Sequence, residues 1–158
     1  MNITDTTPTE SNLSGLDRKD FQKNINSRKT DLYILKNAQG MEVAVTNYGC
    51  AILSIMVPDK NGKFANVILG HDSIEHVINS PEPFLSTTIG RYGNRIANGK
   101  FTLYGEEHQL TVNNGPNSLH GGPTGFHARV WDAVQPNEST VIFNYTSADG
   151  EEGFPGTL

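Results

Sequence analysis

Residues 88–122 carry the sequence T-I-G-R-Y-G-N-R-I-A-N-G-K-F-T-L-Y-G-E-E-H-Q-L-T-V-N-N-G-P-N-S-L-H-G-G. The stretch opens with Arg91 and Arg95 among glycines and asparagines, and it closes with His120 followed by two glycines. Between these ends, residues 100–110 alternate in polarity around a bend at 104–107, which predicts a β-hairpin. The rest of the chain has the pattern of a scaffold for the two ends of this stretch.

Short β-rich runs flank this stretch on both sides and recur about every 8 to 12 residues between turn signals. They lie at residues 32–35, 42–46, 51–57, 66–69, 128–134 and 140–146. Residues 72–79 predict only one or two helical turns, and no longer amphipathic helix or βαβ alternation is apparent. The pattern therefore predicts an all-β fold, either an antiparallel sandwich or a barrel.

The composition limits the partners and the setting of the chain. A formal charge of -5 over 158 residues gives no basic surface, so nucleic acid is not an expected partner. No apolar run of membrane-spanning length occurs, which argues against a membrane partner. The single cysteine, Cys50, excludes an internal disulfide framework, so a reducing, cytoplasmic setting is expected.

The N-terminal residues differ in composition from the rest. Residues 1–15 are rich in Thr, Ser, Asn and Pro with few apolar side chains, which predicts a disordered tail. Residues 1–10 have neither the basic nor the apolar region of a secretory signal peptide. We therefore expect one folded domain over residues 16–158, beginning with an irregular arm that includes Phe21.

The arginines and the histidine of the 88–122 stretch are the leading candidates for ligand contact. A guanidinium offers five donors in a fixed fork, and nearby glycines let the backbone approach a ligand closely. From the pattern alone, pairing of Arg91 and Arg95 with carboxylates or carbonyls, which would stiffen the loop, is favoured over ligand contact. His120 suits a polar ligand, or else a structural bond to a backbone carbonyl.

Other polar and aromatic residues carry weaker signals. His71, His76, His108 and His127 have no zinc-ligand spacing and are expected to be surface or loop residues. Trp131 is expected in the core, although an aromatic ring near a cleft can also stack on a sugar. The carboxylates at 149–152 fit a solvated turn better than a ligand site. No G-x-S-x-G motif supports a hydrolase.

Taken in order, the motifs of this chain resemble the N-terminal part of the aldose 1-epimerase (galactose mutarotase) family. The longest matches are I-G-R-Y-G-N-R-I-A at 89–97, L-H-G-G at 119–122 and D-G-E-E-G-F-P-G at 149–156. Shorter pieces match at 46–49, 57–62, 69–70, 99–101, 113–117, 125–126 and 131. The resemblance implies a galactose-mutarotase-like antiparallel β-sandwich and interconversion of the α and β anomers of aldohexoses such as galactose and glucose.

The resemblance also implies which residues touch the sugar. The second arginine of the G-R-x-x-N-R motif and the histidine of L-H-G-G correspond to Arg95 and His120, with Asn94 beside the arginine. Arg91 is a candidate supporting residue. Anomer exchange needs one acid and one base on opposite sides of the ring, without metal or other cofactor, so none is expected. The oligomeric state is left open.

This chain departs from the family in length. Family enzymes are roughly twice as long, and the acid histidine and base glutamate that the resemblance implies match no motif of this chain. We therefore expect an incomplete sandwich and an inactive fragment of a mutarotase. A non-catalytic carbohydrate-binding module and a non-functional gene fragment are the alternatives that the sequence leaves open.

Overall fold

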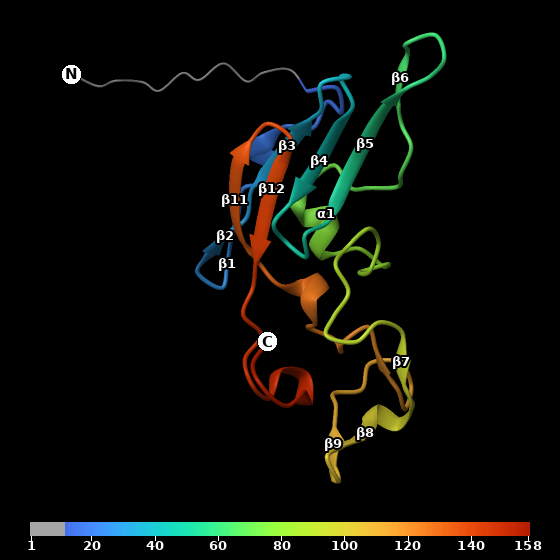
Figure 1. Ribbon diagram of the computed structural model, residues 1–158, viewed down its shortest axis with the longest axis vertical. Helices are drawn as coiled ribbons and strands as arrows, with labels where there is room; N and C mark the ends of the chain where they lie inside the picture. The colour runs from blue at the N-terminus through green and yellow to red at the C-terminus, as the bar shows by residue number, and fades with distance from the viewer. Residues whose placement is uncertain (1–11) are drawn as a thin grey trace, which may run out of the picture.

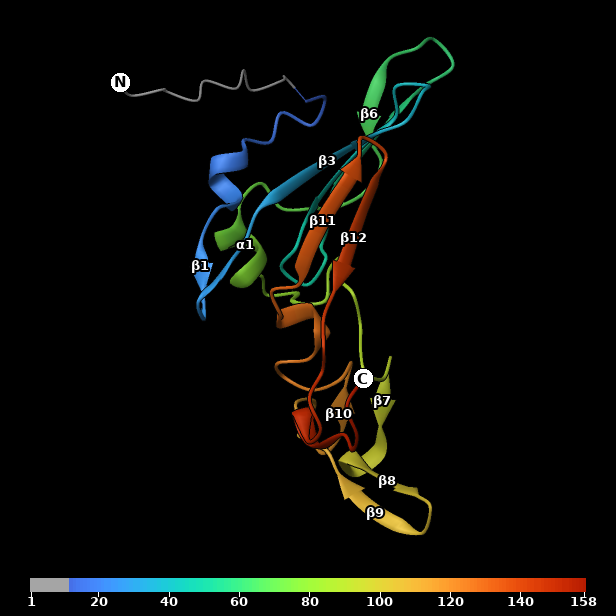
Figure 2. The same cartoon turned by 60° about the vertical axis from the view of Figure 1, so that its left-hand side comes forward.

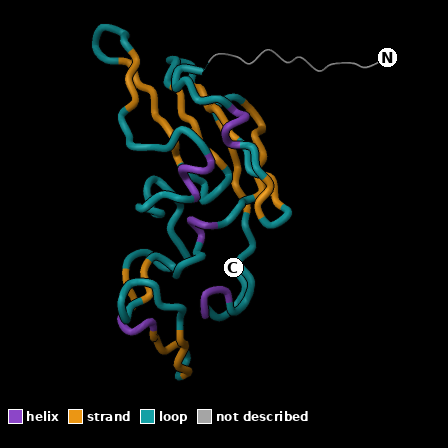
Figure 3. The backbone as a smooth tube through the Cα atoms, turned by 180° about the vertical axis from the view of Figure 1, so that it is seen from behind, coloured by secondary structure: helices purple, strands orange, loops and turns teal. Residues whose placement is uncertain are grey.

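The structure is a computed structural model and describes residues 12–158. It is elongated, with a four-stranded sheet in one half and a group of loops and short strands in the other (Figure 1). Residues 1–11 of the predicted tail lie outside the described residues. Long loops carry the chain between the two halves (Figure 3).

The four-stranded sheet follows the chain order of its strands. These are β3 (Leu32–Lys36), β4 (Glu42–Thr46), β5 (Ile52–Pro58) and β6 (Phe64–Asn66), and each pairs antiparallel with the next. The ladder between β4 and β5 shifts register beside Ala44, as a β-bulge does. The predicted hairpin at 32–46 is confirmed.

Two turns of the sheet have the same local chemistry. The side chain of Asn37 accepts hydrogen bonds from the backbone of Gln39 and Met41, at 3.0 and 2.9 Å. The side chain of Asp59 does the same for Asn61 and Lys63, at 2.8 and 2.9 Å. In each turn the fourth residue is a glycine with positive φ, Gly40 or Gly62. Such side-chain bonds compete with strand formation and end the strands here.

The hydrophobic core lies on one face of this sheet. The 3-10 helix Arg18–Phe21 and the helix α1 (Ile74–Ile78) contact each other and contribute the fully buried Phe21 together with Ile74 and Val77. Ser73 caps α1 by accepting a bond from the His76 backbone at 3.3 Å. The core cluster contains Phe21, Leu32, Ala44, Ala51, Leu53, Ile74 and Val77.

A buried carboxylate holds the described start of the chain against the sheet. Glu42 on β4 is 0% exposed, and it accepts hydrogen bonds from the backbone of Leu13 and Ser14, at 2.9 and 3.0 Å. Paired backbone donors offset much of the cost of burying the charge. Within the arm that follows, β1 (Asn24–Ile25) and β2 (Arg28–Lys29) form a two-residue ladder.

A second antiparallel hairpin packs against β3. It consists of β11 (Asp132–Asn137) and β12 (Thr140–Asn144), and Figure 2 shows it crossing the sheet. Tyr33 meets Phe143 edge to face, with 5.9 Å between ring centroids. The Lys36 backbone donates to the Glu138 carbonyl at 2.8 Å. Every strand pairing among residues 12–158 is antiparallel, which confirms the predicted all-β class.

The other half of the molecule contains the remaining strands. The predicted hairpin at 100–110 is present as β8 (Lys100–Leu103) and β9 (Glu106–Gln109). Beside it, β7 (Arg95–Ile96) pairs with β10 (Ser118–Leu119). The 3-10 turn Ala97–Gly99 joins β7 to β8, and two further 3-10 turns, Phe126–Ala128 and Glu151–Gly153, follow β10 and β12. Within the described chain, no helix is long and apolar enough to cross a membrane.

Two predicted strands have different bounds in the structure. The strand expected at 66–69 is instead β6, which ends at Asn66 because its side chain takes a place in the ladder and accepts the Ile55 amide at 3.0 Å. The strand expected at 128–134 begins only at Asp132. The residues just before it pair with 47–49 instead, since the Trp131 amide donates to the Asn47 carbonyl at 2.8 Å.

Candidate functional site

A short ladder brings the two ends of the 88–122 stretch together. Arg95 on β7 pairs with Leu119 on β10, and Ile96 pairs with Ser118. The next residue after β10 is His120, whose backbone donates to the Asn94 carbonyl at 3.0 Å. Two segments more than twenty residues apart in sequence therefore place Asn94, Arg95 and His120 side by side.

Asn94 connects the other two residues of this group. Its backbone N–H donates to Nδ1 of His120 at 3.0 Å, and its side-chain oxygen accepts a bond from Nη1 of Arg95 at 3.3 Å. Asn94 and His120 both have positive φ, of 68° and 53°. Asparagine tolerates this region, whereas histidine enters it only at a cost in conformational energy. The reciprocal bonds to Asn94 hold His120 in this conformation.

Arg95 is exposed, and two asparagine side chains fix the position of its guanidinium by bonding to Nε and Nη1. Its Nε donates to the side chain of Asn114 at 2.8 Å, in addition to the Nη1 bond to Asn94. Its Nη2 group donates to no residue between 12 and 158. The remaining N–H groups of this fixed guanidinium are therefore free to donate to a ligand with oxygen acceptors.

Close glycine contacts hold the two loops against each other. A Cβ on Gly121 would lie 1.8 Å from the Gly90 carbonyl oxygen, and one on Gly125 would lie 2.7 Å from the same atom. A Cβ on Gly90 would lie 2.1 Å from the ring of Phe126. Only glycine permits backbones to approach so closely, which explains the glycine content of both loops.

Arg91 uses its guanidinium to hold the C-terminal segment. Its Nε donates to the Ser147 hydroxyl at 2.9 Å, and its Nη2 donates to the carbonyls of Ser147 and Ala148, at 3.0 and 2.7 Å. Its Nη1 donates to the Pro155 carbonyl at 3.0 Å. These contacts match the stiffening role that the sequence left open for an arginine of this loop, since all three guanidinium nitrogens bond to the C-terminal segment.

Phe84 lies against His120, and His127 lies against Phe84 in turn; neither was among the predicted site residues. The ring centroid of Phe84 is 4.8 Å from that of His120 and 4.5 Å from that of His127. The prediction that His127 is a surface or loop residue is wrong in its exposure, because only 4% of it is exposed. Burial, reinforced by the nearby His120, lowers the pKa of His127.

The carboxylates and the tryptophan near this region have structural partners. Glu152 accepts the Thr124 amide at 3.0 Å, and Glu151 accepts the hydroxyl of Tyr145. Trp131 packs against the rings of Phe126 and Tyr145, with centroids 5.4 and 5.3 Å away. These contacts tie the 120–131 loop to the C-terminal segment, but Trp131 is only half-buried and lies outside the core cluster, so it is not the core residue that the sequence predicted.

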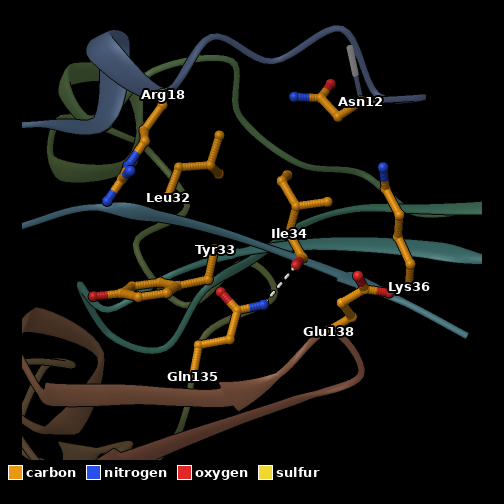
Figure 4. Close-up of a pocket in the computed structure, with 8 residues that line it drawn as sticks. All are labelled: Asn12, Arg18, Leu32, Tyr33, Ile34, Lys36, Gln135 and Glu138. Carbon is orange, nitrogen blue, oxygen red and sulfur yellow. Dashed lines mark hydrogen bonds between the residues drawn. The ribbon is translucent and has the colours of Figure 1, made fainter. Parts of the chain in front are cut away.

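A cavity of about 670 Å³ lies in the other half of the molecule (Figure 4). It is lined by β3, by the arm and by the β11–β12 hairpin, and Gln135 reaches across it to the Ile34 carbonyl at 2.7 Å. It shares no lining residue with the Asn94, Arg95 and His120 group. Within residues 12–158, no group of three or more His, Cys, Asp or Glu residues could hold a metal ion.

Comparison with known proteins places the fold and these motifs in context. Residues 31–158 match the aldose 1-epimerase family. Galactose mutarotase of Bos taurus is 42% identical over 118 residues, or 75% of this chain and 34% of that protein. Aldose 1-epimerase of Escherichia coli is 42% identical over 127 residues, or 80% of this chain and 36% of that protein.

Solved structures give the same result. The GalM/aldose epimerase homologue from C. elegans superimposes with a TM-score of 0.76 at 32% identity, over 81% of this chain and 39% of that one. Galactose 1-epimerase from Lactobacillus acidophilus superimposes with a TM-score of 0.73 at 30% identity, over 85% and 40%. The chain therefore has the galactose-mutarotase-like fold predicted for it.

The chain belongs to the aldose 1-epimerase family. It spans about a third of the length of the curated relatives that it matches, at 34% and 36%.

Proposed function

We propose that Arg95 and His120 grip one flank of a sugar ring, and that the protein to which they belong interconverts the α and β anomers of aldohexoses such as galactose and glucose. The observation that carries this proposal is that both side chains bond to Asn94, the imidazole to its backbone N–H and the guanidinium to its side-chain oxygen. Relatives named galactose mutarotase and aldose 1-epimerase support the same activity.

The reaction determines what such a site has to supply. A base removes the proton of the C1 hydroxyl while an acid protonates the ring oxygen, so that the bond from C1 to the ring oxygen breaks and an aldehyde forms. Rotation about the C1–C2 bond and closure by the reverse proton transfers give the other anomer. Arg95 and His120 hold hydroxyl and ring oxygens during these steps, because donors in fixed positions suit a ligand rich in lone pairs.

The acid and the base are assigned to residues outside this chain. The family resemblance implies a histidine and a glutamate for these roles, in motifs that residues 1–158 do not contain. We therefore propose that this chain binds sugar weakly from one side and does not accelerate anomer exchange. The reducing, cytoplasmic setting expected from the single cysteine suits an enzyme that acts on free hexoses.

Polarimetry and calorimetry on the same sample test the two parts of the proposal. Calorimetry is expected to give galactose binding that is lost in Arg95→Met and in His120→Phe but kept in Lys100→Ala, on the neighbouring hairpin. Polarimetry of freshly dissolved α-galactose is expected to show the spontaneous rate only. Binding that survives in both site variants would refute the sugar site. Acceleration by the 158-residue chain would refute the assignment of the acid and base to other residues.

A further inference from the structure

Phe84 contacts the rings of two histidines from the loop after β10. The interplanar angles are 62° with His120 and 61° with His127, at centroid distances of 4.8 and 4.5 Å. These edge contacts have the geometry that aromatic rings prefer. Phe84, His120 and His127 together are called the ring cluster below.

The Asn94 backbone decides which nitrogen of His120 carries the proton. A backbone N–H can only donate, and it donates to Nδ1 of His120 at 3.0 Å. Nδ1 must therefore present its lone pair, which leaves the proton of the neutral ring on Nε2. An Nδ1–H tautomer would set two hydrogens against each other at this distance.

The position of the ring is fixed as tightly as its tautomer. The main chain of His120 is held at a φ of 53°, with its own N–H bonded to the Asn94 carbonyl at 3.0 Å. Asn94 fixes both the backbone and Nδ1 of His120. The edge contact with Phe84 then restricts the remaining rotation of the imidazole ring. The nitrogen that no described residue fixes is Nε2.

We propose that Phe84 is a positioning residue of the sugar site, which holds His120 as a neutral Nε2–H donor toward an oxygen of the bound sugar. This inference rests on the proposed function. It makes His120 a hydrogen-bond donor to a lone pair of a hydroxyl or ring oxygen, and no proton is transferred at this residue. The positively charged fork of Arg95 and this neutral donor then share the recognition of the sugar oxygens.

His127 supports Phe84 from within the protein. It is 4% exposed, and its Nδ1 has no hydrogen-bond partner among residues 12–158. Burial lowers the pKa of His127, so the ring stays uncharged near neutral pH and packs against Phe84 as an aromatic surface. The ring cluster therefore connects the buried His127 through Phe84 to the half-buried imidazole of His120.

Nitrogen NMR of the histidine rings tests the proposal without any sugar. In the 158-residue chain labelled with 15N-histidine, long-range proton–nitrogen correlations are expected to show a protonated Nε2 and a bare Nδ1 for His120. The resonance is assigned by its loss in His120→Gln. An Nδ1–H tautomer, or fast averaging between the two tautomers in the unchanged protein, would overturn the inference.

Substitutions of Phe84 test its positioning role. Phe84→Leu removes the edge contact, so that the imidazole can rotate off its bond to the Asn94 N–H, and we expect averaging of the His120 tautomers and about fivefold to tenfold weaker galactose binding. Phe84→Tyr keeps the ring and is expected to retain both properties. The matched control is Phe101→Leu, because Phe101 packs against a different imidazole, that of His108, at 5.2 Å. It is expected to leave the His120 signals unchanged.

The outcomes separate this inference from the proposed function. A Phe84→Leu protein with native amide signals, an unchanged His120 tautomer and unchanged galactose affinity would overturn the role of Phe84. If that variant does not fold, a Phe84→Tyr protein with averaged tautomers would overturn it instead. Absence of galactose binding in the unchanged protein, with the Nε2–H tautomer present, would refute the sugar site and still support the positioning of His120.

Discussion

Gly121 lies so close to Gly90 that no side chain can be accommodated there. Both Gly121 and Gly105 have a φ of 86°, but a Cβ on Gly105 would meet no atom within 4 Å. Gly105→Ala therefore measures the backbone cost alone, of about 1–2 kcal/mol. Gly121→Ala adds the clash with the Gly90 carbonyl, and we expect it to lower the free energy of unfolding by at least about 3 kcal/mol. Urea denaturation gives both values, and equal losses would show that the loops are not in contact.

Cys50 is a half-buried thiol whose environment disfavours the thiolate form. Burial raises the pKa of Cys50 to about 12, and a hydrogen bond with Thr88 opposes this shift only in part. Because the thiolate is the reactive species, alkylation by iodoacetamide at pH 8 is expected to be about 100-fold or more slower in the native protein than in urea. Similar rates in the two states would mean that Cys50 is exposed in the folded protein.

The lowered pKa of His127 links stability to pH. Its ordinary value is 6.5, and the unfolded chain binds a proton there while the folded protein resists it. The free energy of unfolding therefore falls as the pH drops below about 6.5, by at most about 1.4 kcal/mol per pH unit. We expect His127→Gln to have a shallower slope between pH 5 and 7, measured by urea denaturation at each pH. Parallel slopes for the two proteins would contradict the burial of His127.

At the scale of elements, the guanidinium of Arg91 joins the loop before β7 to the C-terminal segment. The amides of Ser147 and Leu158 bond to each other's carbonyls, at 2.8 and 2.9 Å, next to the residues that the Arg91 guanidinium contacts. Arg91→Lys keeps the charge but loses the fork, and we expect hydrogen exchange at these two amides to become about tenfold faster or more. The control Arg28→Lys alters an exposed pair with Asp132, at 2.9 Å, and is expected to leave this exchange unchanged. Unchanged exchange in Arg91→Lys would refute the claim that the Arg91 guanidinium stabilises the C-terminal segment.

The sequence predicts the hairpins well because their turns are local. Asn37 and Asp59 bond to backbone groups only two and four residues ahead, so the pattern of neighbouring residues is enough to place these turns. The bounds of β6 and β11 depend on distant partners. Asn66 takes the place of a ladder group opposite Ile55, and Trp131 bonds to Asn47, which no local pattern reveals.

The candidate site likewise has residues that the sequence predicts and residues that only the folded structure reveals. Motif spacing leads to Asn94, Arg95 and His120, because their loops carry recognisable glycines on either side. Phe84 and His127 lie outside that pattern, and they reach the site through ring contacts formed only when the chain folds. A phenylalanine that directly follows a proline-containing turn at 80–83 gives no signal that it will pack against a loop histidine. Burial, which made the expectation for His127 wrong, is likewise a property of the assembled fold.

At the scale of the whole molecule, the sheet and the candidate site lie in different halves (Figure 1). The sheet half holds the core cluster, and the other half holds Asn94, Arg95 and His120 on loops fixed by glycine contacts. The matched solved structures are covered to only 39% and 40% of their length. We therefore expect one flank of a sugar site here, with affinity in the millimolar range that a few exposed donors provide.

Amide and side-chain NMR of the 158-residue chain during a galactose titration tests the central claim most directly. The account predicts saturable shifts at Asn94, at the guanidinium of Arg95 and at the imidazole of His120. It also predicts no comparable shifts with galactitol, the open-chain polyol that has the same configuration at C2 to C5 but no ring. Galactose shifts confined to other residues, or equal shifts with galactitol, would contradict the recognition of a sugar ring by this pair of side chains.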